Sequence, residues 1–137
     1  MRIRIVLMSN DNKEFKNKTI SEIQNEYFNK YLKKEHKYYY GKKGINALEG
    51  DLLLFEMQNK IIASAVLNNV YCYSEEFNGN KGAFDLKDIH IFKPIEKEEL
   101  RELINGFTSF GRYRKRTFEE SEIKDIEKLK KRMKVNE

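Results

Sequence analysis

The stretch GDLLLFEMQNKIIASAVL, residues 50–67, contains the strongest structural signal in the chain. Residues 52–57 are almost wholly apolar, which is typical of a strand covered on both faces. Residues 58–60 then separate this run from a second apolar run, and Asn59 tolerates the left-handed backbone of a tight turn. The stretch therefore predicts a β-hairpin whose first strand is buried within a layered domain.

A strand and a helix are predicted before this hairpin. Residues 2–8 alternate charged and apolar side chains before becoming wholly apolar, as in a strand that enters a sheet. Thr19 and Glu22 have the spacing of a capping box, and the apolar residues that follow predict a helix to about Lys34. Residues 36–41 predict a short aromatic strand.

The second half of the chain predicts two strands and two helices. Residues 83–92 predict a strand that Pro94 ends, and residues 95–107 carry an apolar stripe at helical spacing. Residues 112–118 predict a last, basic strand. Thr117 with Glu120 predicts the cap of a final amphipathic helix.

The order of these elements predicts one α+β domain that spans residues 1–137. Short loops and a hairpin favour a small curved sheet or partly closed β-barrel of about five or six strands, flanked by about three helices. A doubly wound fold is disfavoured, because helices do not regularly separate the strands.

Composition narrows the classes of function. The chain carries a formal net charge of +5, which favours polyanionic partners without requiring one. The single cysteine, Cys72, excludes an internal disulfide and is expected to be a buried filler in a reducing compartment. Neither a secretory signal nor a membrane-spanning segment is recognisable, so we expect a cytoplasmic protein without a membrane partner.

Enzymatic motifs are not recognisable in the sequence. Walker, G-x-G-x-x-G and G-x-S-x-G motifs are missing, as are paired Cys and His at metal spacing. Two weaker alternatives stay open: a metal site at Asp85, Asp88 and His90, and a nuclease-like E-x-K formed by Glu35 and Lys37. We predict no catalytic residue, no cofactor and no metal.

The tyrosine stretch YYYGKKG, residues 38–44, is the first candidate binding element. In an extended chain Tyr38 and Tyr40 share one face and Tyr39 takes the other, so one face packs on the core and one looks elsewhere. The plain interpretation is a half-buried strand with exposed tyrosines. The alternative is a ring that lines a pocket for a planar base, with Lys42 and Lys43 placed to meet phosphate.

The basic stretch GRYRKRTF, residues 111–118, is the second. On a strand, Arg112, Arg114 and Arg116 alternate onto one face and form a row that can follow a phosphate backbone. The alternative is an edge strand that carries charge to prevent aggregation.

The sequence also resembles a known group of domains. Gly50 and Asp51 before a strand with Phe55, then a hairpin to IIASA, together with DIHIFKPI at residues 88–95, are similar to the PUA-like superfamily, and especially to its EVE and YTH-like branches. The resemblance covers most of the chain. It implies a compact barrel flanked by helices that reads a modified base in RNA or DNA.

The resemblance also implies where the base would bind. The pocket would lie between the loop after the first strand, with Ser9 or Asn10 bonding the base edge, and the aromatic strand, with Tyr39 or Tyr40 stacking on the base. The protein departs from methyl-adenine readers, whose cages are largely tryptophan, because it contains no tryptophan. Tyrosine or phenylalanine would have to substitute.

These observations lead to one main function hypothesis and two alternatives. The first is a module that binds RNA or DNA, recognises a single base, modified or not, and works alone or beside a separate effector enzyme. The second is an enzyme that acts on nucleic acid or nucleotides with a dispersed active site. The third is a protein-interaction or inhibitor domain from a mobile element, with a basic surface that docks an acidic partner.

Overall fold

The protein has an α+β fold with one six-stranded mixed sheet. The computed structural model describes residues 2–8, 15–40, 47–77, 80–111 and 114–133, with the backbone alone at residues 40, 73–77, 80 and 81. The strands are β1 (Ile3–Leu7), β2 (Lys37–Tyr40), β3 (Leu52–Met57), β4 (Lys60–Phe77), β5 (Asn80–Glu96) and β6 (Thr117–Phe118).

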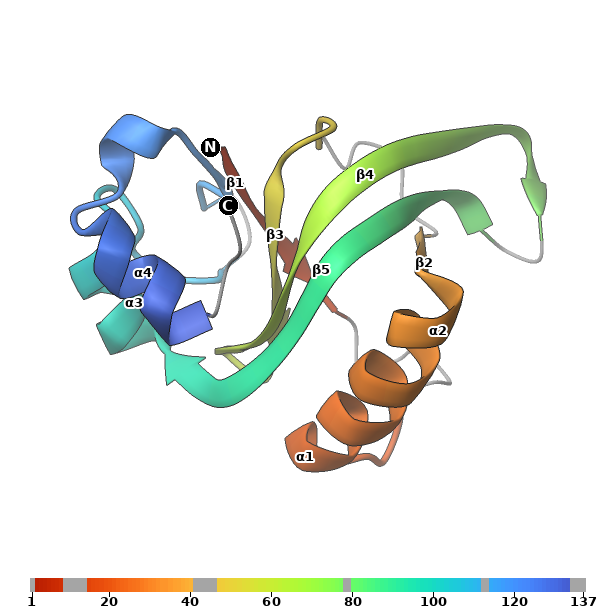
Figure 1. The fold of residues 1–137 in the computed structure, drawn as a ribbon, viewed down its shortest axis with the longest axis horizontal. Coiled ribbons are helices and arrows are strands. Elements are labelled where there is room, and N and C mark those ends of the chain that lie inside the picture. The colour runs from red at the N-terminus through yellow and green to blue at the C-terminus, as the bar shows by residue number, and fades with distance from the viewer. Residues whose placement is uncertain (1, 9–14, 41–46, 78–79, 112–113, 134–137) are drawn as a thin grey trace.

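The strands lie in the order β2-β5-β4-β3-β1-β6 (Figure 1). β1 runs parallel to β3, and the other pairs are antiparallel. Among the described residues no ladder joins β2 to β6, so the sheet is open. The predicted α+β class and strand number are confirmed, whereas closure into a barrel is not part of what the structure describes.

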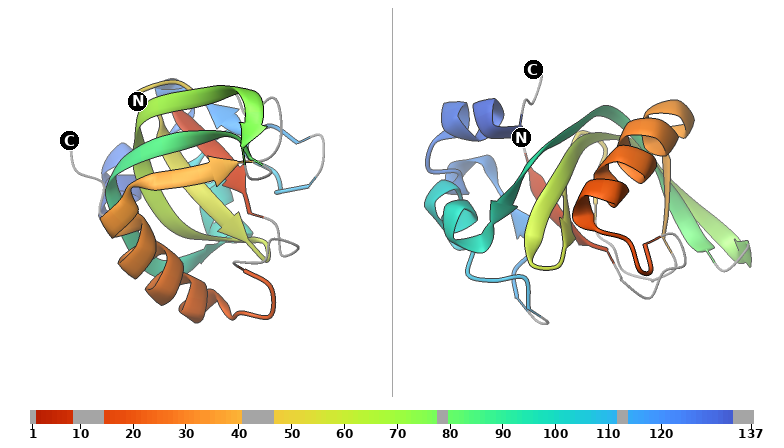
Figure 2. Two further views of the ribbon diagram at one scale, coloured as in Figure 1. Left: turned by 90° about the vertical axis from the view of Figure 1, so that its right-hand side faces the viewer. Right: turned by 90° about the horizontal axis from the view of Figure 1, so that it is seen from below.

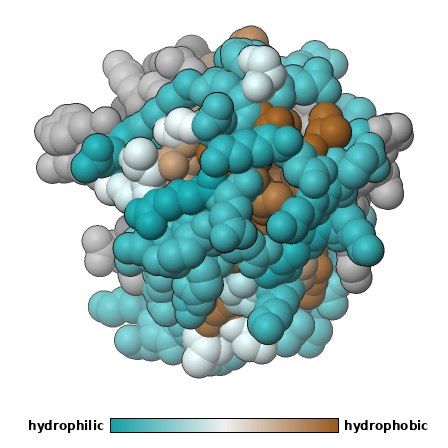
Figure 3. Space-filling view, turned by 90° about the vertical axis from the view of Figure 1, so that its left-hand side faces the viewer, coloured by the Kyte–Doolittle hydropathy of each residue, from teal (hydrophilic) through white to brown (hydrophobic). Residues whose placement is uncertain are grey.

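The helices form two groups. One continuous N-terminal helix consists of α1 (Ile20–Glu22), the π-helical η1 (Ile23–Leu32) and α2 (Lys33–Glu35). The C-terminal group contains α3 (Lys97–Leu103), the 3-10 turn η2 (Glu120–Glu122) and α4 (Ile126–Met133). Figures 1 and 2 show the two groups on different sides of the sheet. Seen from the side of α3 and α4, the surface is mainly hydrophilic with small apolar patches (Figure 3).

The central strand β3 separates two hydrophobic cores. All six of its residues are buried, as the sequence predicts. Leu53, Phe55 and Met57 face a core shared with the N-terminal helix. Leu52 and Leu54 face a second core, shared with α3 and α4. The alternation of side chains along a strand therefore lets one strand build both cores.

The predicted hairpin between β3 and β4 is confirmed. Gln58 and Asn59 have positive φ angles of 53° and 64°, as a tight reversal with a matching twist requires. Met57 then pairs with Lys60 directly across the turn.

The N-terminal helix begins at the predicted capping box. The Thr19 hydroxyl accepts from the Glu22 N–H, and the Glu22 carboxylate accepts from the Thr19 N–H, each at 3.1 Å. One side of the helix packs on the sheet through residues that include Ile23, Phe28 and Leu32, all fully buried. On the same side, the Gln24 amide donates to the carbonyl oxygens of Ile62 and Phe92, each at 2.8 Å.

These two carbonyls mark a bulge between β4 and β5. Ile61 pairs with Ile95 and Ala63 pairs with Ile91, so one residue on β4 lies opposite three on β5. Pro94 lies inside this interruption, where its missing N–H costs no ladder bond. The prediction that Pro94 ends the strand is therefore wrong, because β5 continues to Glu96.

The C-terminal predictions need three corrections. α3 ends at Leu103 instead of continuing to residue 107. Among the described residues of the predicted basic strand, 114–118, only β6 forms, and Thr117 belongs to this strand and not to a helix cap. The final helix begins later, after Asp125, whose carboxylate accepts from the Lys128 N–H at 3.0 Å in an N-cap bond.

Replacement of Gln24 by alanine is expected to lower the free energy of unfolding by about 2 kcal/mol, because two partly buried carbonyls lose their donors. Urea denaturation measures this change. Asn25→Ala is the matched control, since the neighbouring amide is exposed and contacts only Ser21 of its own helix at 3.5 Å among the described bonds. Equal losses in the two variants would contradict a special role for Gln24.

Candidate functional site

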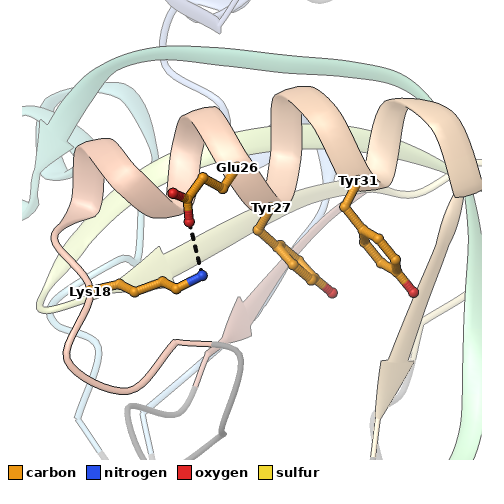
Figure 4. A pocket seen from close by; sticks show the side chains of 4 residues that line it. All are labelled: Lys18, Glu26, Tyr27 and Tyr31. Atoms are coloured by element: carbon orange, nitrogen blue, oxygen red, sulfur yellow. Dashed lines mark hydrogen bonds and ion pairs between the residues drawn. The ribbon is translucent and has the colours of Figure 1, made fainter.

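A hollow lined by two tyrosines lies beside the N-terminal helix. Its volume is about 200 Å³, and its described lining consists of Lys18, Glu26, Tyr27 and Tyr31 (Figure 4). We call it the tyrosine hollow. Tyr27 and Tyr31 are four positions apart on one helix, so their rings lie side by side, with centroids 5.5 Å apart and planes 23° from parallel.

The aromatic wall of the tyrosine hollow, formed by Tyr27 and Tyr31, packs against core rings on its buried side. The Phe15 ring meets Tyr27 edge-on at 4.8 Å, and the Tyr38 ring does so at 6.3 Å. Tyr27 is only 8% exposed, whereas Tyr31 is 38% exposed. The inner ring is therefore positioned by the core, and the outer ring presents its surface to solvent.

An ion pair forms the polar side of the tyrosine hollow. The Lys18 Nζ lies 2.9 Å from a carboxylate oxygen of Glu26. The hydrogen bond from Lys18 lowers the pKa of Glu26 below its ordinary value, so the carboxylate keeps its charge. A cationic donor and an anionic acceptor thus stand beside the aromatic wall (Figure 4).

The predicted tyrosine strand forms, and its side chains divide between the two faces of the sheet. Tyr38 is buried in the core against Phe55 and Phe84, whereas Tyr39 on the other face is 37% exposed. Tyr39 is not among the described residues that line the tyrosine hollow. Tyr40 pairs with Gly82 through its backbone, and its side chain lies outside the described part. Ser9, Asn10, Lys42 and Lys43 also lie outside the described residues.

The predicted arginine row is only partly described. Arg112 lies outside the described residues, and residues 114–116 precede β6, so strand alternation does not place them. Arg114 is exposed. Arg116 is half-buried, and its Nε has no hydrogen-bond partner among the described residues.

Arg4 is a cationic neighbour that the sequence analysis did not single out. Its Nη1 donates to the Thr117 hydroxyl at 3.1 Å, while its buried Nε has no partner in the described part of the chain. Burial lowers the pKa of Arg4, and the charges of Arg116 and Arg2 add to this effect. The alternation in RIRI at residues 2–5 was the available signal, since it places arginines on the face opposite to the isoleucines.

The Gly-Asp pair of the resemblance has a structural role here. Gly50 adopts a φ of 92°, and Asp51, only 3% exposed, accepts from the Arg2 guanidinium at 3.0 and 2.7 Å. The same carboxylate accepts from the Leu48 N–H at 2.8 Å. Asp51 therefore joins the start of β3 to the start of the chain, and its buried carboxylate is fully engaged.

The candidate metal site at Asp85, Asp88 and His90 and the environment of Cys72 can be compared with the described geometry. Within the described residues no three His, Cys, Asp or Glu side chains gather as a metal site would require. Asp85 accepts from the Asn68 amide at 3.1 Å. Cys72 is exposed, so the prediction of a buried filler is wrong, and no described helix is long and apolar enough to cross a bilayer.

Comparison with known protein families, with curated proteins and with solved structures finds no match to this chain. What the site does is therefore inferred from its residues and their geometry. The resemblance to PUA-like domains also stays a hypothesis, because it rests on the sequence alone.

Glu56 is a buried carboxylate with a predictable pH effect. It is 9% exposed, and burial raises its pKa, although a bond from the Asn59 N–H at 3.2 Å and the charge of Arg116 act in the opposite direction. A raised folded pKa means that the fold favours the protonated acid. The contribution of Glu56 to stability is therefore full at low pH and is lost as pH rises through the folded pKa.

Glu56→Gln is expected to gain stability relative to the natural protein as pH rises above about 4.5, with a plateau above the folded pKa of Glu56. Unfolding free energies from urea titrations between pH 3 and 8 measure this gain. Glu26→Gln is a control of opposite sign, because the pKa of Glu26 is lowered and its contribution is lost as pH falls. A pH-independent difference for Glu56→Gln would contradict the burial effect.

Proposed function

We propose that this protein is a nucleic-acid-binding module that holds a single base, modified or not, in the tyrosine hollow. It performs no chemistry on the base. The observation that carries the proposal is the stacked pair of Tyr27 and Tyr31, which lines a hollow of about 200 Å³. A cavity of roughly 150 Å³ can hold benzene, so this space suits one flat heterocycle.

The polar side of the tyrosine hollow supports recognition of a base edge. Glu26 can accept from an exocyclic amino group, while Lys18 can donate to a ring carbonyl or ring nitrogen. Lys18 and Glu26 pair with each other at 2.9 Å. A base that bonds both groups therefore replaces this contact with hydrogen bonds from its own edge. Stacking on a tyrosine contributes about 1–3 kcal/mol and helps to offset this exchange.

Basic residues would hold the phosphates around the base. The net charge of +5 attracts a polyanion, and the exposed Arg114 and half-buried Arg116 are candidates for contacts to its backbone. Arg112, Lys42 and Lys43 remain candidates from the sequence. Arg4 adds a guanidinium near Arg116 that an oxyanion would stabilise.

The proposal also covers the fold family of the domain and its location in the cell. We place the domain with PUA-like modules of the EVE and YTH-like type, in which the curved sheet forms a partly closed barrel. Its place of action would be the cytoplasm, where RNA or DNA and a separate effector enzyme are the partners. Support comes from the sequence pattern at residues 50–67 and 88–95 and from the basic charge.

Tyr31→Ala is expected to weaken binding of a nucleoside by roughly tenfold, because the exposed ring of the hollow is lost while its buried partner stays. Isothermal titration with a panel of natural and methylated nucleosides measures the affinity. Tyr31→Phe keeps the ring and should bind as the natural protein does.

Tyr39→Ala is the matched control for this test, since its exposure is similar but it points to the other face of β2. Loss of nucleoside binding in Tyr39→Ala but not in Tyr31→Ala would move the pocket to the aromatic strand. Absence of binding to every nucleoside would contradict the proposal, and metal-dependent turnover of the panel would favour the enzyme alternative.

A further inference from the structure

A second aromatic surface lies on the outer face of the sheet. Tyr39 on β2 pairs with Ala83 on β5, and Ala83 pairs with Tyr71 on β4. Residues directly opposite each other on neighbouring strands point to the same face. The next register line, Tyr38 with Phe84 and Val70, packs on the inner core. Tyr39 and Tyr71 therefore project together from the outer face.

Both tyrosines present ring area to solvent although Ala83 between them is fully buried. Tyr39 is 37% and Tyr71 is 40% exposed. Two strand spacings place their backbones about 10 Å apart, and the small alanine side chain leaves room for both rings over the middle strand. The pair thus forms a shallow aromatic platform on the sheet.

A lysine completes this platform. The Lys37 Nζ lies 5.3 Å from the centre of the Tyr71 ring, in a cation–π contact across the sheet. Lys37 lies on the same face as Tyr39, two positions along β2, and it pairs in register with Asp85. The Asp85 carboxylate accepts from the Asn68 amide, while the ammonium of Lys37 lies over the ring.

We propose that Lys37, Tyr39 and Tyr71, which we call the tyrosine surface, bind single-stranded nucleic acid without sequence preference. Bases stack on the two rings, since every base offers a flat face to an aromatic side chain. The flexible lysine moves from the Tyr71 ring to a phosphate when a base covers that ring. The net charge of +5 favours a polyanion over an apolar peptide. The two exposed rings favour nucleic acid over an acidic peptide, because each base brings a flat face to a ring.

The tyrosine surface extends the proposed function. Its ligand is the single-stranded nucleic acid that flanks the base held in the tyrosine hollow. The inference rests on the proposed function for the class of partner. The two sites are nevertheless separate, because the tyrosine surface lies on the face of β2 opposite to Tyr38, whose ring contacts Tyr27 of the hollow. Short oligonucleotides therefore test the tyrosine surface, whereas free nucleosides test the hollow.

Fluorescence anisotropy with labelled single-stranded dT and rU oligonucleotides at low salt tests the inference. Tyr71→Ala and Tyr39→Ala should each weaken binding by about tenfold, whereas Tyr71→Phe should bind normally and Tyr71→Leu should not. Lys37→Gln should reduce the slope of log affinity against log salt by about one. Thermal denaturation of each variant establishes that the fold is kept.

Asn25→Ala is the control, because Asn25 is exposed on the N-terminal helix and belongs neither to the described lining of the hollow nor to the tyrosine surface. If Tyr39→Ala and Tyr71→Ala bind oligonucleotides as tightly as the natural protein does, the tyrosine surface is not the binding site. Failure of the natural protein to bind either oligonucleotide also overturns the inference. In both cases, nucleoside binding that Tyr31→Ala weakens by about tenfold would still support the tyrosine hollow as a base site. If the natural protein bound no nucleoside, the proposed function would be contradicted as well.

Discussion

The burial of β3 on both faces is the constraint on which the rest of the structure depends. A strand without a solvent face needs a layer on each side, and its alternating side chains divide between the N-terminal helix and the α3–α4 pair. The N-terminal helix must lie close to the sheet to cover Phe55, and its Tyr27 is then wedged between Phe15 and Tyr38. The tyrosine hollow is therefore a product of core packing with one ring left at the surface.

Local patterns predicted the first half of the fold well because the decisive signals there are short-range. The Thr19 capping box and the turn at Asn59 each depend on residues within a few positions of one another. The second half depends on long-range pairing. Pro94 lies within β5 at a bulge whose Ile62 and Phe92 carbonyls accept from Gln24, far away in the chain, and no local pattern contains that information.

The candidate site was predicted less completely than the fold. Alternation along residues 38–40 correctly separated a buried ring from an exposed one, as Tyr38 and Tyr39 show. The hollow was missed because Tyr27 and Tyr31 look like ordinary members of an apolar helical stripe until the exposure of each ring is known. Tyr71 was missed for a different reason, since its partnership with Tyr39 depends on the register of three strands.

The bulge in β5 is contacted by the N-terminal helix on one face of the sheet and by α4 on the other. From one side Gln24 bonds the Phe92 carbonyl, and from the other Arg132 of α4 bonds the Pro94 carbonyl at 3.2 Å while its guanidinium lies 5.9 Å from the centre of the Phe92 ring. Detachment of either layer would remove a contact from Phe92. The two layers are consequently coupled through Phe92, so an opening of one layer also weakens the contact of the other layer with β5.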